Sequence, residues 1–226
     1  LLMNAIPAIV AGVEEIVVCT PTPHNQPNEL LLATLHLCGI RESYKVGGAS
    51  AIGLMAYGGG DFQKVDVITG PGNIYVATAK KMVFGDVNID MIAGPSEIGI
   101  IAQSGANTEY IAWDLLSQAE HDELASSILI SDDRELIVES IAHIERIIPT
   151  LSRKDIAQAS IQNRSVFIHT SSLDESVALM NKIAPEHLEI LTPDPFSLIP
   201  RIKNAGAIFL GEYASEPIGD YLAGPN

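Results

Sequence analysis

Short runs of β-branched residues alternate with longer amphipathic stretches along this chain, and this alternation limits the folds that it can adopt. Residues 15–19 have the pattern of a buried strand, and residues 28–37 that of a helix that ends at Gly39. The same reasoning predicts two further strands in this part, at 43–46 and 65–69. It also predicts two further helices, at 49–57 and in the stretch after Asn73 through Met82. Strands separated by helices are typical of βαβ units, so we expect a parallel sheet here.

The alternation continues beyond the turn Gly94-Pro95. Residues 107–119 are expected to form a helix capped by Asn107, in which Trp113 fits a core position. The remaining expectations are strands at 98–102, 128–130, 165–169, 187–191 and 207–210, and helices at 134–148, 173–183 and 195–203. The sequence therefore predicts an α/β fold of two incomplete Rossmann-like units, residues 1–97 and 98–226, with mainly parallel sheets flanked by helices.

The charge balance excludes two classes of partner. The chain has 28 acidic and 13 basic residues, which gives a formal net charge of −15. Such a field repels polyanions, so we expect neither a nucleic-acid nor a membrane partner. The two cysteines are too few for a disulfide scaffold. Because the chain opens on an uncharged run and stops at a turn sequence, we expect it to be an internal part of a longer protein.

The end of the predicted helix 107–119 carries the first candidate site. Gln118 and His121 are three residues apart, so their side chains share one helical face. An amide oxygen and an imidazole nitrogen in this arrangement are a possible start of a metal site. On spacing alone, however, a polar helix end is favoured, with His121 near the negative end of the helix dipole.

A second candidate site lies where Pro185 precedes an apolar strand. Glu186 and His187 form a carboxylate–imidazole pair there, which is suited to general acid–base chemistry. Adjacent residues of a strand point to opposite faces, so a joint role requires irregular backbone at this point. A polar helix-to-strand turn is the alternative.

Three turns supply weaker candidates. The turn 70–73 joins a strand to a helix, where free N–H groups suit a phosphate, although an ordinary βα turn explains it equally well. Ser96 lies at the expected junction of the two units, where clefts tend to form. Asp220 lies near the end of the chain and is a possible further oxygen ligand of a metal site.

Taken together, these segments resemble histidinol dehydrogenase over essentially the whole chain. Five motifs occur in the order of that family: Gly-Pro-Gly-Asn at 70–73, Ala-Gly-Pro-Ser-Glu at 93–97, Leu-Leu-Ser-Gln-Ala-Glu-His at 115–121, Pro-Glu-His-Leu at 185–188 and Gly-Asp-Tyr at 219–221. The resemblance implies a cytoplasmic, zinc-dependent homodimer that uses NAD. Its reaction is the oxidation of L-histidinol through L-histidinal to L-histidine, the last steps of histidine biosynthesis.

The resemblance also implies roles for particular residues. His187 matches the general base, and Glu186 matches the residue that activates water on the aldehyde. Ser96 matches a serine that contacts the substrate. Gln118, His121 and Asp220 match ligands of zinc (Zn²⁺), which holds the substrate, and the same three residues match the substrate site. Gly72, Asn73 and Ser50 match residues on the side of NAD, in the unit 1–97.

Some features depart from the family pattern. The family's fourth zinc ligand, a histidine of the partner subunit, lies beyond Asn226, and Ser50 stands where many members have glutamine. We therefore expect the chain alone to bind zinc weakly and to be poorly active. Three alternatives remain at this point: a dehydrogenase of another amino alcohol, a zinc hydrolase in which Glu186 activates water, and a non-catalytic module.

Overall fold

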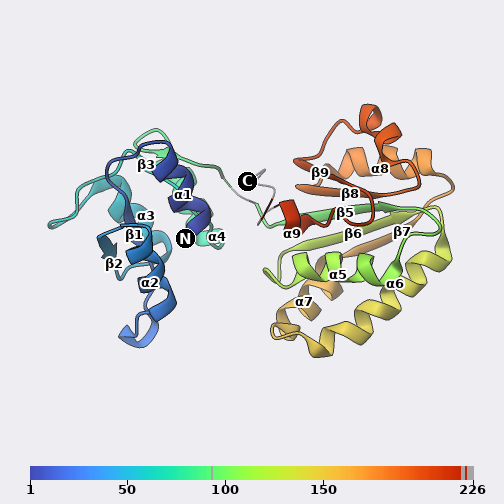
Figure 1. Cartoon of the computed structure of the whole chain (residues 1–226), viewed down its shortest axis with the longest axis horizontal. Coiled ribbons are helices and arrows are strands. Elements are labelled where there is room, and N and C mark those ends of the chain that lie inside the picture. The colour runs from blue at the N-terminus through green and yellow to red at the C-terminus, as the bar shows by residue number, and fades with distance from the viewer. Residues whose placement is uncertain (93, 220–221, 223–226) are drawn as a thin grey trace. The chain divides into compact units, whose positions relative to one another are not determined.

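The structure is a computed structural model, and it describes residues 1–92, 94–219 and 222. The chain divides into two compact units, Leu1–Gly94 and Pro95–Asn226, which the colours of Figure 1 distinguish. The boundary expected at residue 97 falls three residues later than this division. Ser96 already belongs to the second unit, because its carbonyl oxygen accepts a hydrogen bond from the amide nitrogen of Ser126 at 3.0 Å.

The N-terminal unit contains two small parallel sheets. In one, β1 (Val17–Cys19) pairs with β2 (Glu42–Tyr44), and in the other, β3 (Val67–Ile68) pairs with β4 (Asn88–Ile89). The helical elements of this unit are α1 (Leu2–Val10), the 3-10 turn η1 (Pro23–Asn25), α2 (Glu29–Leu37), α3 (Gly48–Tyr57) and α4 (Ile74–Val83). The larger apolar cluster of the unit is formed by Ile52, Ala56, Ile68, Val83 and Val87.

The expectation of one sheet in this unit is wrong. The strands predicted at 15–19 and 43–46 pair with each other, but the third, at 65–69, pairs with β4. The sequence pattern did not predict β4, because a strand of two residues shows no alternation of apolar and polar positions. The helix α1 was also missed, since its run of apolar residues contains Pro7.

The C-terminal unit is built on one parallel sheet of five strands in the order β7-β6-β5-β8-β9. The chain adds strands first on one side of β5 and then on the other, which is the doubly wound order of Rossmann-like folds. This confirms the predicted fold class. The strands are β5 (Glu97–Ala102), β6 (Ser126–Ser131), β7 (Val166–His169), β8 (His187–Leu191) and β9 (Ala207–Leu210).

Helices cover both faces of this sheet (Figure 1). Ile98 and Ile100 of β5 pack in one apolar cluster with residues of α5, α6 and α7, whereas Ile101 packs in the other with residues of α8 and η3. Alternate residues of a strand point to opposite faces, so one buried strand supplies both cores. The helical elements are α5 (Thr108–Ala119), α6 (Arg134–Ile147), η2 (Ile148–Thr150), α7 (Lys154–Arg164), α8 (Leu173–Ile183), η3 (Pro195–Arg201) and α9 (Glu216–Ile218).

Most expected elements of this unit are confirmed, and α5 begins after the predicted cap Asn107. Three details differ. Trp113 is 46% exposed and does not lie in the core. The helix expected at 195–203 is the 3-10 element η3, which contains two prolines, and α7 was missed because it has few apolar residues. Within the described ranges, no helix is both long and apolar enough to cross a bilayer.

Candidate active site

Several predicted site residues gather at the amino edge of the five-stranded sheet, where its parallel strands begin. His187 is the first residue of β8 and lies between Ile98 of β5 and Ala207 of β9. Ser96 directly precedes β5 and is half-buried. The helix α5 connects the end of β5 to the start of β6, so its last turn carries Gln118 back to this edge.

Gln118 and His187, 69 residues apart, are in contact. The Oε1 atom of Gln118 lies 3.2 Å from Nδ1 of His187. Gln118 is 1% exposed, and the His187 side chain is 12% exposed. An amide oxygen can only accept a hydrogen bond, so this arrangement puts the ring hydrogen on Nδ1. The other ring nitrogen, Nε2, is then the proton acceptor of the histidine.

A buried carboxylate stands close to the same ring nitrogen. Oε1 of Glu216 lies 4.0 Å from Nδ1 of His187. Glu216 is 2% exposed and begins the short helix α9. A carboxylate at this distance favours a hydrogen on Nδ1, the ring nitrogen nearest to it. The position of Glu216 therefore agrees with the tautomer that the Gln118 contact indicates.

Two further carboxyl groups lie behind Glu216. Oε1 of Glu189, in β8, accepts a hydrogen bond from the backbone amide of Glu216 at 2.8 Å. Burial raises the pKa of Glu189 well above its usual range, and the neighbouring Asp114 charge adds to this increase. Burial also raises the pKa of Asp114 from 3.8 to about 6, against the opposing effect of its hydrogen bond with Glu189. Two carboxyl groups in such contact hold a proton more tightly than an isolated one.

Glu186 has a fixed backbone and an exposed side chain. Before it, Ala184 adopts a left-handed conformation (φ 57°, ψ 57°), which turns the chain from α8 toward β8. The carbonyl oxygen of Glu186 accepts a hydrogen bond from Ala207 N at 2.8 Å. A Cβ atom at Gly206 would lie 2.6 Å from that oxygen, so only glycine fits there.

His121 is exposed, just beyond α5. Its amide donates to Gln118 O at 3.2 Å, and its carbonyl oxygen accepts a hydrogen bond from the Arg153 guanidinium at 3.2 Å. In the described part of the chain, Gln118 and His187 are the two predicted site residues that a hydrogen bond between side chains joins. Asp220 lies outside the described residues.

Three N–H groups at the glycine-rich turn of the N-terminal unit and at the start of α4 have internal partners. Asn73 caps α4, and its Oδ1 accepts hydrogen bonds from Tyr75 N at 3.1 Å and Val76 N at 3.2 Å. The amide of Gly70 donates to Asp90 at 2.8 Å. A Cβ atom at Gly72 would lie 2.4 Å from the side chain of Val76, so close packing explains this glycine. A phosphate at this turn would have to displace these acceptors.

Ser50 lies in the first turn of α3, which begins after Gly47, and its side chain is exposed. Gly48 in the same turn has a φ of 66°, a backbone conformation that favours glycine. The position leaves Ser50 accessible to a ligand.

Zinc and NAD can be tested against the side chains that are present. The imidazole nitrogen of His121 and the amide oxygen of Gln118 come from one helix end, and this combination of nitrogen and oxygen donors fits zinc in kind. Among the described residues, no three histidine, cysteine, aspartate or glutamate side chains gather into a metal-binding group. A phosphate at the turn 70–73 would meet occupied donors, because Asp90 accepts the Gly70 amide and Asn73 accepts the Tyr75 and Val76 amides at the start of α4.

The sequence reasoning missed Asp114, Glu189 and Glu216. A signal existed for Glu189, since it is the acidic residue inside the otherwise apolar run Leu188–Leu191. A charged residue in a strand that is buried on both faces requires a partner. The partner itself is far away in the sequence, and no local pattern points to it.

A doubly wound parallel sheet with a buried imidazole–amide pair and carboxyl groups behind it is typical of an α/β enzyme. The family model for histidinol dehydrogenase matches residues 1–226. The chain therefore belongs to the histidinol dehydrogenase family.

Two curated relatives and one solved structure illustrate the similarity. The histidinol dehydrogenases of Helicobacter hepaticus and Wolinella succinogenes are 72% and 65% identical to this chain over 226 residues, which is 100% of the chain and 52% of each relative. The crystal structure of histidinol dehydrogenase from Elizabethkingia anophelis is 40% identical, with a TM-score of 0.92, over 100% of this chain and 52% of that one. The chain thus spans about half the length of these relatives, as expected for a segment of such a protein.

Proposed function

We propose that this chain carries the acid–base centre of an enzyme that oxidises L-histidinol through L-histidinal to L-histidine with NAD. The family match over the whole chain supports the reaction. The observation that carries the proposal is the contact between Gln118 and His187, because it joins the residues that match a metal ligand and the general base. We also propose that the N-terminal unit is the NAD side, and that the enzyme is a cytoplasmic homodimer.

In the first oxidation, His187 is the base. With a hydrogen on Nδ1, its Nε2 accepts the proton of the substrate hydroxyl while a hydride leaves the carbon atom that carries this hydroxyl. Glu216 lies 4.0 Å from Nδ1 and stabilises the positive charge that the ring then carries. Loss of the hydride and the proton converts the alcohol into the aldehyde.

In the second oxidation, Glu186 acts on water. Its exposed carboxylate accepts a proton from a water molecule, whose oxygen attacks the aldehyde carbon. The resulting hydrate anion loses a second hydride to give the carboxylic acid, and this acid loses a proton to give the carboxylate of L-histidine. An exposed side chain suits this role, since water has to reach it.

The other matched residues bind zinc, the substrate or NAD. Gln118, His121 and Asp220 would hold zinc, and Ser96 contacts the substrate from the start of β5. Zinc supplies a positive charge that polarises the substrate hydroxyl and anchors the substrate between the two oxidations, and NAD supplies the hydride acceptor. Ser50, Gly72 and Asn73 lie on the proposed NAD side, where Ser50 offers an exposed hydroxyl.

The test is NAD reduction, followed by absorbance, with L-histidinol and zinc at mildly alkaline pH. It compares the chain, a version extended to the length of its relatives, and the extended His187→Ala variant. We expect the extended protein to reduce NAD, and the variant to lose about 100-fold or more in kcat. An extended protein that binds zinc and is inert would contradict the dehydrogenase and favour a zinc hydrolase. Activity with other amino alcohols but not with L-histidinol would show that the enzyme is a dehydrogenase of a different amino alcohol.

A further inference from the structure

Two buried carboxyl groups and one partly buried carboxyl group lie near His187, and the reaction described above uses only the charge of Glu216. Glu189 is 0% exposed and Glu216 is 2% exposed, and Asp114 is partly buried on α5. Burying acidic groups is unfavourable unless each has a defined partner. Their arrangement therefore needs a reason beyond packing.

A series of contacts connects the sheet to the histidine ring. Glu189 is in the centre of the unit, on β8, and its Oε1 accepts the backbone amide of Glu216 at 2.8 Å. This amide is at the N-terminus of α9, a helix of three residues that has little stability of its own. The carboxylate of Glu216 then lies 4.0 Å from Nδ1 of His187.

At the end of this series of contacts farthest from His187, Glu189 and Asp114 share a proton. Oε2 of Glu189 is buried and receives no hydrogen bond from a conventional donor in the described part of the chain. The Asp114 carboxyl lies within hydrogen-bonding reach of Glu189. Two ionised carboxylates can only accept, so this contact is satisfied when one of the two groups is protonated. The raised pKa of each group agrees with this state.

We propose that Glu216 is a positioning residue, which holds the His187 ring with its hydrogen on Nδ1, and that Glu189 fixes Glu216 in place through the start of α9. This inference rests on the proposed role of His187 as the base. Glu216 thereby makes Nε2 the ring nitrogen that accepts the substrate proton. Glu189 acts by accepting one backbone hydrogen bond, so a neutral side chain of the same shape can replace it.

The experiment uses the zinc-loaded extended protein and four single variants. Glu216→Gln removes the charge and keeps the shape, and we expect kcat to fall by about 10- to 100-fold with KM changed by less than about 3-fold. Glu189→Ala leaves the Glu216 amide without its acceptor and should lower kcat to a similar degree. Glu189→Gln retains an acceptor oxygen and gains a donor toward Asp114, so its kcat should stay within about 3-fold of wild type.

Ser160→Ala is the control for simple destabilisation. Ser160 is also buried, and its hydroxyl donates to Ala125 O at 2.9 Å, just before β6, which β5 separates from the strand β8 of His187. We expect this variant to lower the melting temperature and leave kcat unchanged. A loss of kcat in Ser160→Ala equal to that in Glu189→Ala would overturn the positioning role.

A second measurement separates this inference from the proposed function. The ¹⁵N chemical shifts of the His187 ring, assigned with the His187→Ala variant, report which nitrogen carries the hydrogen. In the wild type, the Gln118 oxygen and the Glu216 charge together favour a hydrogen on Nδ1; in Glu216→Gln only Gln118 remains, so we expect a larger share of the tautomer with its hydrogen on Nε2. If the wild type does not oxidise L-histidinol, the proposed function fails, and the ring shifts still decide the positioning role. Unchanged shifts in Glu216→Gln would overturn that role.

Discussion

The two edges of the five-stranded sheet carry polar side chains that do different things. In open doubly wound sheets, ligands usually bind outside the carboxyl edge, at the point where the strand order reverses, which is between β5 and β8 here. A cavity of about 520 Å³ does lie at that edge, between Gln103, Asp132 and Pro193. The residues that match the catalytic base and a metal ligand lie at the opposite, amino edge.

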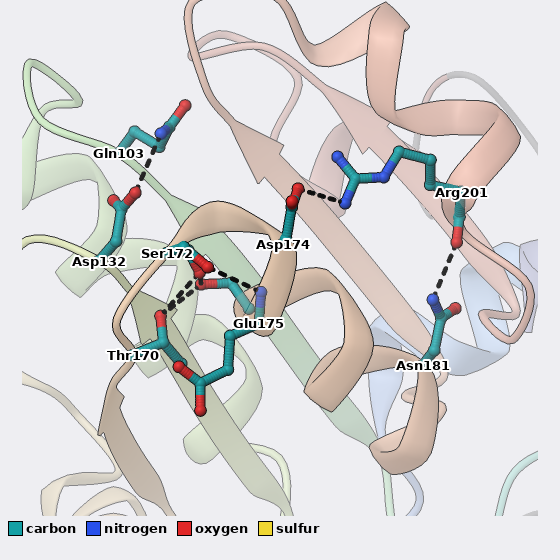
Figure 2. Close-up of polar contacts among 9 residues, drawn as sticks. Gln103, Asp132, Thr170, Ser172, Asp174, Glu175, Asn181 and Arg201 are labelled. Carbon is teal, nitrogen blue, oxygen red and sulfur yellow. Dashed lines mark hydrogen bonds and ion pairs between the residues drawn. The ribbon is translucent and has the colours of Figure 1, made fainter.

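At the carboxyl edge, polar side chains mainly satisfy the backbone. Figure 2 shows Gln103 donating to Asp132, and Ser172 accepting the amide of Glu175 at the start of α8. Asp133 caps α6 in the same way. At the amino edge, Gln118 contacts the His187 side chain and Glu189 holds the Glu216 amide. The comparison teaches that the fold determines where helix N-termini lie, and that the side chains determine where chemistry is possible.

The comparison is tested most strongly by one substitution made at both edges. Gln118→Ala removes the buried partner of His187 and a matched metal ligand, whereas Gln103→Ala removes a contact at the carboxyl edge. In the extended protein, we expect the first variant to lower kcat for L-histidinol by about 100-fold. The second should keep kcat within about 2-fold. Equal losses in the two variants would show that the edges do not differ in function.

The buried carboxyl pair gives the amino edge a characteristic pH dependence. The folded-state pKa of Asp114 is raised from 3.8 to about 6, so the protonated group stabilises the fold below about pH 4. This contribution is lost as the pH rises through about 6. In Asp114→Asn, the loss should disappear, and at pH 8 the free energy of unfolding should exceed that of wild type by about 2 kcal/mol.

Urea unfolding between pH 4 and pH 8 measures this difference. Asp174→Asn is the matched control, because Asp174 is an exposed aspartate that forms an ion pair with Arg201 in Figure 2. Its unfolding free energy should keep the wild-type dependence on pH. The explanation is wrong if the unfolding free energy of Asp114→Asn changes with pH as steeply as that of the control.

The smallest effect is expected from a cap at the carboxyl edge. Ser172→Ala removes the hydroxyl that accepts Glu175 N at 3.3 Å, which should lower the unfolding free energy by about 1 kcal/mol. Catalysis should be unaffected, because this residue supports α8 and not the amino edge. Ser104→Ala, at an exposed serine of the same edge, is the comparison. A change in kcat would mean that the two edges are coupled.

The sequence predicted the C-terminal unit better than the N-terminal one for a physical reason. The strands β8 and β9 are apolar runs, and helices such as α5 begin at a recognisable cap, so local patterns suffice. In the N-terminal unit, pairing depends on strands of two or three residues, whose partners are set by packing between distant segments.

The same distinction applies to the site. The motifs around Gln118 and His187 could be found in the sequence, but their contact across 69 residues could not. Spacing alone favoured a polar helix end for Gln118, and the fold gives the reason why that interpretation was incomplete: the last turn of α5 meets the first residue of β8. The role of the supporting carboxyl groups could not be predicted, because Glu189 stands out in an apolar strand but neither Glu189 nor Glu216 has a local partner pattern.

The close approach of Gly206 to the Glu186 carbonyl oxygen has a consequence for how a side chain can work at this edge. The carbonyl oxygen of Glu186 is held against the start of β9, with no room for one extra carbon atom at Gly206. The Glu186 carboxylate, in contrast, extends into solvent on a flexible stem. The carboxylate therefore has a fixed point of attachment and a reach set by the length of its own side chain, so it can change position in solvent without any motion of the main chain.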